Sequence, residues 1–284
     1  MYETSQKTGL TGNALKLIAI ITMFIDHSAA FLIENGYFAV NENTGEGTPG
    51  FILASRLLTV DMVCRAIGRI AFPIFLFLLV EGFLHTSSLL KYGVRLLLFA
   101  VISEIPFDLA NNGTVLEFSY QNVFFTLFLT LLAMAGYEAV ENRFGKDNKV
   151  LAVLLCIVVF LITTTAASLL RTDYASAGVG MGTVIWFLRK KRSAQPLALM
   201  AFIIVYCILQ TYFDSASGTG PVINFVRFYF DNISFVEVLC VAAYLFIMRY
   251  NGERGSFLPK YVFYAFYPVH MLILTGIRYL MFKI

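Results

Sequence analysis

Charged side chains are scarce in this chain: Asp, Glu, Lys and Arg make up 14% of its 284 residues, whereas hydrophobic residues make up 58%. The mean hydropathy of +0.75 is far too high for a soluble domain of this length. The breaks between apolar segments are short and leave no room for a separate soluble domain. We therefore expect one polytopic membrane domain that covers residues 1–284.

Several familiar motifs are missing as well. No GxSxG, HExxH, GxGxxG or P-loop pattern occurs, which argues against a serine hydrolase, a zinc protease, a Rossmann enzyme or an ATPase. The four cysteines lack CxxC spacing and lie in or beside apolar segments, which is typical of buried small side chains, so no metal site is expected. No signal peptide is expected, because no small-residue cleavage site follows the first, long apolar run.

What the sequence does contain is a series of apolar runs of about 17 to 25 residues, which predict membrane-spanning helices. The expected fold is an all-α polytopic transmembrane bundle of about nine to ten helices. Spans are predicted near residues 13–34, 66–86, 93–110, 121–140, 149–168, 176–188, 197–213, 233–249 and 262–282. The span at 176–188 is short and rich in glycine, which suggests tight packing or a partly re-entrant helix. Residues 51–63 are interrupted by Arg56 and Asp61 and are expected as an additional interfacial helix.

The distribution of Lys and Arg predicts the orientation. A cytoplasmic N-terminus places fourteen of the 21 basic residues on the cytoplasmic side. The run Arg189-Lys190-Lys191-Arg192 is the strongest single anchor of this kind. Because membrane topology explains the basic residues, the net charge of +3 gives no reason to expect nucleic acid as a partner.

His27, preceded by Asp26, lies inside the first apolar run, Leu15 to Ile33. An ionisable ring at membrane depth is costly and therefore indicates function. The eleven residues from Lys16 to His27 carry the ring about 16 Å inward, past the bilayer midplane. A neutral imidazole could act as a general base there, provided that a carboxylate holds one ring nitrogen. Asp26 could instead pair with another residue such as Arg69, so the identity of that carboxylate stays open.

Other polar groups are expected at a similar depth. Arg65 and Arg69 are four residues apart and share a helical face, as two guanidinium groups that hold an anion would. Further polar residues flank the predicted spans, namely Glu104 and Asp108 at the end of the third, Asn122 at the start of the fourth, and Asp173 before the sixth. Singly, each carboxylate could be a structural partner of an arginine. Together with His27 they favour a site. In the last span, His270 follows Phe266-Tyr267-Pro268 and could face a path from the cytoplasm.

An ordered set of motifs resembles the TraX family over nearly the full chain. The motifs are Ile67-Gly68-Arg69-Ile70-Ala71-Phe72-Pro73-Ile74-Phe75, Leu78-Leu79-Val80-Glu81-Gly82-Phe83 with His85-Thr86, Lys91-Tyr92, Arg95, Ser103-Glu104-Ile105-Pro106-Phe107-Asp108-Leu109, Asn122 with Phe124-Phe125-Thr126-Leu127, Asp173-Tyr174, and Phe266-Tyr267-Pro268-Val269-His270. TraX proteins are known as inner-membrane proteins of conjugative plasmids that are needed to acetylate the N-terminus of the pilin subunit. They are grouped with a wider superfamily of transmembrane acyltransferases. Many chromosomal members have no pilin assigned, so the acceptor here stays open.

The resemblance implies a bacterial cytoplasmic-membrane acyltransferase that uses cytosolic acetyl-CoA. It implies His27 as the catalytic base or acyl relay, and Arg65 and Arg69 as groups that bind the donor or the oxyanion. Asp26 is a further catalytic candidate because it precedes His27. The remaining residues expected to bind substrate or acyl group are Glu104, Asp108, Asn122, Asp173, Tyr267 and His270. The CoA phosphates are expected at Lys91, Arg95, Arg189, Lys190, Lys191 and Arg192.

The expected partners are the lipid bilayer, acyl-CoA, and a protein N-terminus or a glycan at the outer face. Two other classes remain open from the residues alone. The same polar groups could relay protons or bind a solute in an ion-coupled transporter, although no repeated half with matching broken segments is visible. They could also be ion pairs that hold the helices of a non-catalytic assembly factor together. Binding of acyl-CoA by the purified protein would separate the enzyme from both.

Overall fold

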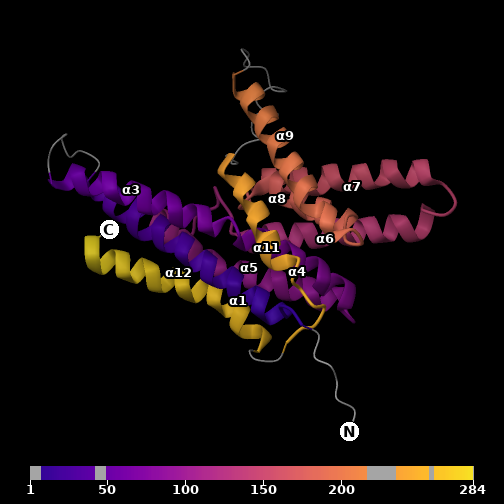
Figure 1. Ribbon diagram of the computed structural model, residues 1–284, viewed down its shortest axis with the longest axis horizontal. Coiled ribbons are helices and arrows are strands. Elements are labelled where there is room, and N and C mark those ends of the chain that lie inside the picture. Colours follow the sequence, from indigo (N-terminus) through magenta and orange to yellow (C-terminus); the bar gives the residue numbers. More distant parts are fainter. Residues whose placement is uncertain (1–7, 42–48, 216–234, 256–258, 284) are drawn as a thin grey trace, which may run out of the picture. The chain divides into compact units, whose positions relative to one another are not determined.

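The structure is a computed structural model of the chain that describes residues 8–41, 49–215, 235–255 and 259–283. In these ranges every extended regular element is a helix, which confirms the expected all-α class (Figure 1). The chain forms two compact units. Unit 1 comprises Met1–Leu78 and Leu239–Ile284, and unit 2 comprises Leu79–Val238. The prediction of a single domain over residues 1–284 stays a prediction.

Six helices among the described residues are long and apolar enough to cross a membrane, which identifies a multi-pass membrane protein. They are Gly12–Asn41, Ile52–His85, Val123–Phe144, Lys149–Leu169, Arg192–Phe213 and Tyr261–Phe282. Two further apolar helices, Ala175–Phe187 and Glu237–Ile247, are shorter. The predicted span at 93–110 corresponds to α5 (Leu89–Asn112), which carries four charged side chains. The predicted cytoplasmic position of the N-terminus stays a prediction.

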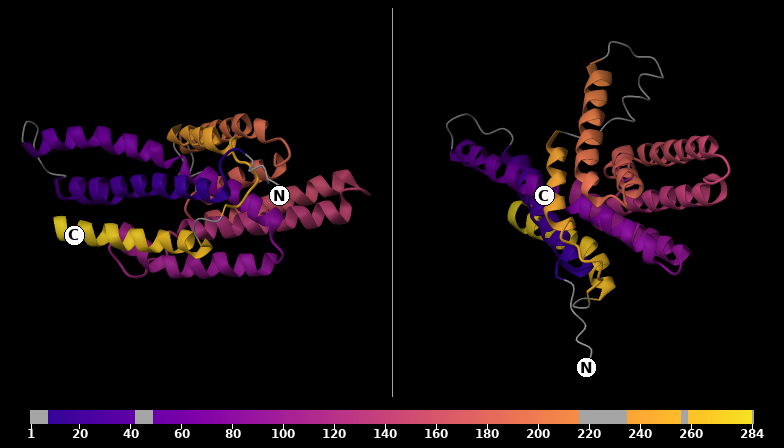
Figure 2. Two further views of the ribbon diagram at one scale, coloured as in Figure 1. Left: turned by 60° about the horizontal axis from the view of Figure 1, so that its bottom comes forward. Right: turned by 45° about the vertical axis from the view of Figure 1, so that its right-hand side comes forward.

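Unit 1 is built around its first helix. Thr11 caps α1 (Gly12–Ser28), because its Oγ1 accepts a hydrogen bond of 3.2 Å from the amide of Ala14. The helix continues into a π-helical segment, η1 (Ala29–Phe38), and ends with the short α2 (Ala39–Asn41). In Figures 1 and 2, α1 lies between α3 (Pro49–Gly68) and α12 (Lys260–Phe282). The first and last helices of the chain therefore pack together in one unit.

The boundary between the predicted interfacial helix at 51–63 and the predicted span at 66–86 was wrong. Helix α3 continues through residues 63–66, and the break falls after Gly68, before α4 (Ala71–His85). Arg69 and Ile70 form the break with hydrogen bonds of 3.3 and 3.2 Å to carbonyl groups three residues earlier. Pro73 lies in the first turn of α4, where its missing N–H costs no helical hydrogen bond. The predicted start of the second span therefore lies inside a continuous helix.

Unit 2 contains α5, α6 (Val123–Phe144), α7 (Lys149–Leu169), α8 (Ala175–Phe187) and α9 (Gln195–Ser215). Polar side chains define where three of these helices begin. Ser88, Asn122 and Asn148 each accept a hydrogen bond from an amide in the first turn of α5, α6 and α7. The helix α6 packs against α5, α7 and α8, so it forms the centre of the unit.

The glycine-rich helix α8 is short and buried. Its 13 residues span only about 20 Å, less than the roughly 30 Å of a hydrocarbon core. Gly180 faces the ring of Phe202 on α9 so closely that a β-carbon would overlap the ring. This packing agrees with the sequence-based expectation of a tightly packed helix at 176–188.

The segment before α12 is less regular than predicted. The predicted span at 233–249 begins at residues outside the described ranges and continues as the 3₁₀ helix η3 (Phe235–Ala243) and α11 (Tyr244–Ile247). The chain then returns to the N-terminus, where Leu10 and Tyr250 form an isolated parallel bridge. Leu10 donates a hydrogen bond of 2.8 Å to the carbonyl of Arg249 in that bridge. This contact ties the start of α1 to the C-terminal part of unit 1.

Candidate functional site

Two histidines from opposite ends of the chain meet in unit 1. His27 on α1 and His270 on α12 are 243 residues apart, and His27 Nδ1 lies 2.7 Å from His270 Nε2. The ring planes differ by 9° and the ring centroids are 4.9 Å apart. That separation nearly equals the nitrogen–nitrogen distance plus the two ring radii, so the imidazoles meet edge to edge in one plane. The contact is an in-plane hydrogen bond between ring nitrogens. We call this pair the histidine pair.

The main chain fixes the proton positions in the histidine pair. His270 Nδ1 lies 2.7 Å from the carbonyl oxygen of Phe266, one turn earlier on α12. A carbonyl only accepts, so His270 Nδ1 carries a proton, and Nε2 of the neutral ring is an acceptor. His27 Nδ1 is then the donor across the 2.7 Å contact. We therefore assign to His27 the tautomer whose Nε2 holds a lone pair and can take up a proton.

Asp26 does not orient His27, as the sequence suggested it could. Its Oδ2 is 4.0 Å from His27 Nε2, beyond hydrogen-bond distance, but only 2.8 Å from Nη1 of Arg65. Nη2 of Arg69 lies 3.9 Å from the other carboxylate oxygen. Gly68 permits this arrangement, because a β-carbon at that position would overlap the Asp26 side chain. The imidazole of His270 thus takes the orienting role expected of a carboxylate.

Two acidic residues belong to the same cluster and were missed from the sequence. Glu34, on η1, accepts from Nε of Arg65 at 3.2 Å, so Arg65 is held between two carboxylates. Asp61 on α3 lies beside Glu34 and is 7% exposed. The signal was present, since each is an acidic side chain in or beside an apolar run. Glu34 was not selected because the first span was predicted to end at that residue. Asp61 was not selected because its segment was expected to lie at the membrane interface.

Aromatic rings surround the histidine pair. Phe31 and Tyr267 lie 5.3 and 6.1 Å from the His27 ring, centroid to centroid. The ring of Phe266 stacks on His270 at 4.7 Å. His270 and Tyr267 are only 2% and 4% exposed, whereas the His27 side chain is 17% exposed. His27 is therefore the more exposed ring of the pair, and His270 the buried one.

The other predicted polar residues form a second cluster in unit 2, where α5 ends and α6 begins. Asn122 caps α6 by accepting from the amide of Phe124 at 3.0 Å. Its amide nitrogen donates to the carbonyl of Ala100 at 2.8 Å and, in a short contact, to the carboxylate of Glu104. Asp108 is fully buried and accepts from the amide of Glu117 at 2.8 Å. The structure thus brings Glu104 and Asn122 into direct contact, with Asp108 one turn along α5.

Asp173 joins this second cluster through the segment before α8. Its Oδ1 accepts a hydrogen bond of 2.8 Å from the hydroxyl of Tyr120. The amide of Asp173 donates to the carbonyl of Gln121 at 2.8 Å, next to an isolated bridge between Gln121 and Thr172. Two neighbours, Tyr174 and Ala175, have positive φ angles of 63° and 38°, a strained conformation for side chains with a β-carbon. The contacts hold this strained segment against the start of α6.

The residues expected to bind CoA phosphates all lie in unit 2. Lys91 and Arg95 occupy the first two turns of α5, and Arg189, Lys190, Lys191 and Arg192 follow α8. The guanidinium of Arg189 lies 4.1 Å over the ring of Trp186 and 3.3 Å from Glu141, so its charge is already engaged. Lys190 and Lys191 are exposed. Their role in binding a donor stays a prediction.

Within the described residues, no three His, Cys, Asp or Glu side chains are placed to hold one metal ion. The histidine pair offers a candidate base: a neutral imidazole with an assigned tautomer and a lone pair on Nε2 of His27. The arginine and carboxylate cluster beside it supplies fixed positive charge where an anion could develop. This combination suits proton abstraction beside fixed positive charge.

A family model and one protein of known name match nearly the full length of the chain. The family model described as TraX protein matches residues 11–278 of the chain. The chain is also similar to the protein called probable fimbrial assembly protein FimC, serogroup H1, of Dichelobacter nodosus. The two are 28% identical over 273 residues, which is 93% of this chain and 94% of that protein. No solved structure matches the chain.

Proposed function

The chain belongs to the TraX family, and from this premise we propose that it is a membrane acetyltransferase that moves an acetyl group from acetyl-CoA to an amine at the outer face of the bacterial cell membrane. The single observation that carries the proposal is the histidine pair, which leaves a lone pair on Nε2 of His27 inside a predominantly apolar helix. A non-catalytic assembly factor has no need for such a base, and an ion-coupled transporter would use it as a proton relay without binding acetyl-CoA.

In the proposed reaction, the acceptor amine attacks the thioester carbonyl of acetyl-CoA. A carbon–nitrogen bond forms, and the carbonyl oxygen becomes an oxyanion. His27 Nε2 takes the proton that the amine loses, and the carbon–sulfur bond then breaks. The proton passes to the thiolate, so the products are the acetylated amine and CoA with a free thiol. The proton on Nδ1 of His27 stays in the hydrogen bond to His270 throughout.

The charged cluster stabilises both charges that this step creates. Once protonated, His27 Nε2 lies 4.0 Å from the carboxylate of Asp26, which favours the imidazolium. We assign the oxyanion to Arg65 or Arg69, whose guanidinium groups both lie beside Asp26 in this cluster. One such donor contributes about 3 to 4 kcal/mol in better-studied acyl-transfer sites. The phosphates of CoA remain assigned to the basic residues of unit 2.

The similar protein of Dichelobacter nodosus supports a proposal for the acceptor of the acetyl group. The Dichelobacter nodosus protein is named a probable fimbrial assembly protein. We therefore propose the N-terminal amine of a pilin or fimbrial subunit as the acceptor, and a glycan hydroxyl as the second choice. An α-amine is a suitable nucleophile once it is deprotonated, which is the task given to His27.

The test uses the purified full chain in lipid nanodiscs with radiolabelled acetyl-CoA. Two peptides serve as acceptors, one with a free N-terminus and one identical but blocked. We expect saturable binding of acetyl-CoA and label only on the free peptide. His27→Ala should lower transfer by roughly 10²- to 10⁴-fold, the usual contribution of a general base.

Two variants control this test. His27→Asn keeps a donor at the position of Nδ1 but has no group at Nε2, so it should bind acetyl-CoA and be inactive. His85→Ala removes an exposed histidine whose Nδ1 contacts only a main-chain carbonyl, that of Glu81, at 2.8 Å, and should keep full activity. Full activity of either His27 variant would end the mechanism. Failure of the parent protein to bind acetyl-CoA would overturn the enzyme assignment.

A further inference from the structure

Unit 2 contains a groove that the proposed reaction does not use. It has a volume of about 680 Å³, within the roughly 300–1,000 Å³ of typical ligand pockets. It is lined by residues of α6, α7, α8 and α9 and by the turn between α6 and α7: Tyr137, Glu141, Gly145, Lys149, Ala152, Val153, Cys156, Ile157, Phe160, Gly180, Thr183, Val184, Phe187 and Phe202. We call it the α6–α9 groove. Its lining is overwhelmingly apolar.

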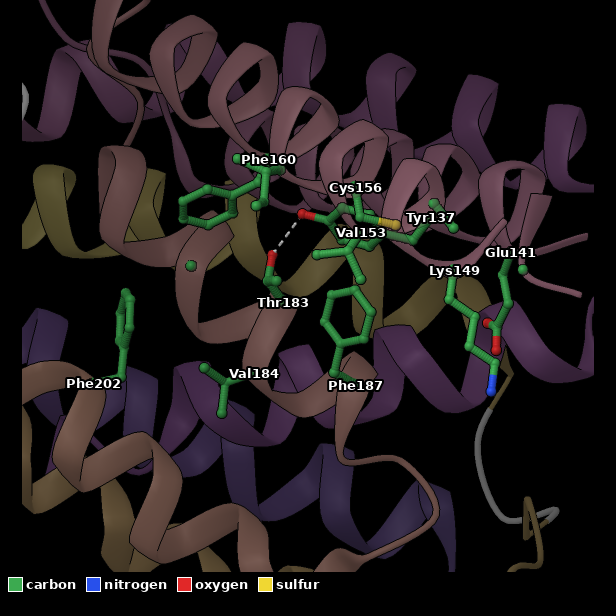
Figure 3. Close-up of a pocket in the computed structure, with 14 residues that line it drawn as sticks. Tyr137, Glu141, Lys149, Val153, Cys156, Phe160, Thr183, Val184, Phe187 and Phe202 are labelled. Carbon is green, nitrogen blue, oxygen red and sulfur yellow. Dashed lines mark hydrogen bonds between the residues drawn. The ribbon is translucent and has the colours of Figure 1, made fainter. Parts of the chain in front are cut away.

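The two ends of the α6–α9 groove differ in character. Figure 3 shows Phe160 and Phe202 around one end and Glu141 with Lys149 at the other. Between them, the hydroxyls of Tyr137 and Thr183 hydrogen-bond to each other at 3.1 Å, so they offer little to a polar ligand. An occupant therefore needs a long apolar part and a polar head at the Lys149 end.

The charged side chains at the Lys149 end determine whether a positive or a negative head group is favoured there. Glu141 is paired with Arg189 at 3.3 Å, which removes its charge from competition, whereas Lys149 is exposed at the rim. This is also the end of unit 2 where α6 and α8 end and α7 and α9 begin. The last turn of α6 and the segments that follow α6 and α8 add five further cations, which outnumber the acidic Glu138 and Asp147: Arg143, Lys146, Lys190, Lys191 and Arg192. A negatively charged head is favoured at such an end.

The groove also opens sideways toward the space that lipid occupies. Val153 and Phe187, on either side of it, are 59% and 52% exposed although both are apolar. At the far end, Gly180 leaves room for the ring of Phe202 to close the groove. We propose that the α6–α9 groove binds one anionic phospholipid, with an acyl chain along the apolar lining and the phosphate at Lys149. The bilayer supplies this ligand.

The only tryptophan of the chain, Trp186, makes the proposal testable by fluorescence. It is 1% exposed and lies on α8, beside the groove-lining residue Phe187, so bulk lipid does not reach it. The full chain is placed in vesicles of phosphatidylcholine that contain either brominated phosphatidylglycerol or brominated phosphatidylcholine. Bromine in a chain seated in the groove quenches Trp186. We expect phosphatidylglycerol to be preferred about fivefold, the effect of one lysine at an anionic surface.

Two pairs of variants separate the head from the chain. Lys149→Gln should remove the preference for phosphatidylglycerol, whereas Lys283→Gln, on the surface of unit 1 and outside the groove lining, should keep it. Val184→Phe fills the groove and should relieve quenching by both lipids, whereas Val158→Phe, on the lipid-facing side of α7, should not. Circular dichroism and gel filtration check that each variant is folded.

Three results would overturn the proposal: equal quenching of the parent protein by both lipids, unchanged quenching in Val184→Phe, or relief of quenching by acetyl-CoA. Relief of quenching by acetyl-CoA would indicate that the groove binds CoA instead of a phospholipid. None of these readouts depends on acetyl transfer, so the lipid site and the proposed function stand or fall separately.

Discussion

The hydrogen bond between the two histidines can be tested with a pair of amide substitutions at His270. In glutamine, the side-chain amide reaches the position of Nε2, so His270→Gln can still accept from His27 Nδ1. In asparagine, the amide reaches only the position of Nδ1, so His270→Asn keeps the contact with the carbonyl of Phe266 but loses the contact with His27. His270→Gln therefore tests the hydrogen bond to His27, and His270→Asn keeps only the hydrogen bond to Phe266.

The size of the effect follows from burial. His270 is 2% exposed, so in His270→Asn the N–H of His27 is left in a dry site without an acceptor. Leaving a buried donor unsatisfied costs about 1 to 3 kcal/mol, which corresponds to a rate about 5- to 150-fold lower. The ring can also change tautomer, which places the proton on Nε2 and removes its lone pair. We expect the loss in kcat rather than in KM for acetyl-CoA, because the donor does not touch His270 in the proposed reaction.

The assay is single-turnover acetyl transfer by each variant in nanodiscs. His270→Gln should retain most of the parent rate, and His270→Asn should show the full loss. Thermal unfolding of both variants in the same nanodiscs controls for general damage. If asparagine supports transfer as well as glutamine does, the assigned tautomer of His27 is wrong and His270 is not a positioning residue.

Two substitutions elsewhere test the surroundings of the two clusters. Gly68→Ala places a methyl group where the Asp26 side chain lies, so transfer should fall at least tenfold. The control is Gly276→Ala, whose methyl group meets open space and should leave transfer and melting temperature unchanged. Equal behaviour of the two variants would show that the close approach of Gly68 to Asp26 is unimportant. Asn122→Ala removes a helix cap and the partner of buried Glu104, so the unfolding free energy in detergent should drop by about 2 kcal/mol or more; a loss below about 0.5 kcal/mol would contradict that role.

The sequence predicted the helices better than it predicted the partners of their polar residues. The apolar runs determine α6 and α7 closely, because hydrophobic length and a capping Asn122 or Asn148 are local signals. The break after Gly68 was missed, because an apolar run continues through it and hydropathy does not register a change of direction. Local pattern therefore gives the existence of an element more securely than its ends.

The histidine pair shows a different limit. His27 was identified from its cost in an apolar run, but nothing local to it points to a residue 243 positions away. Sequence adjacency suggested Asp26 as its partner, whereas adjacent side chains on a helix diverge and Asp26 turns to Arg65 instead. Glu34 follows on a π-helical segment, where the helical spacing used to judge a shared face no longer applies. Which side chains meet across helices depends on how the helices pack, and a single sequence does not reveal that packing.

The separation of the histidine pair along the chain has a consequence for synthesis. His27 lies on the first helix to leave the ribosome, and His270 lies on the last described helix. At roughly 5 to 20 residues per second, the 243 residues between them take roughly 10 to 50 s to make. Throughout that interval the first helix carries an imidazole whose proton has no assigned place. A chain that stops before α12 is inserted has the proposed base but lacks the ring that orients it, so insertion of α12 is the step that completes the histidine pair.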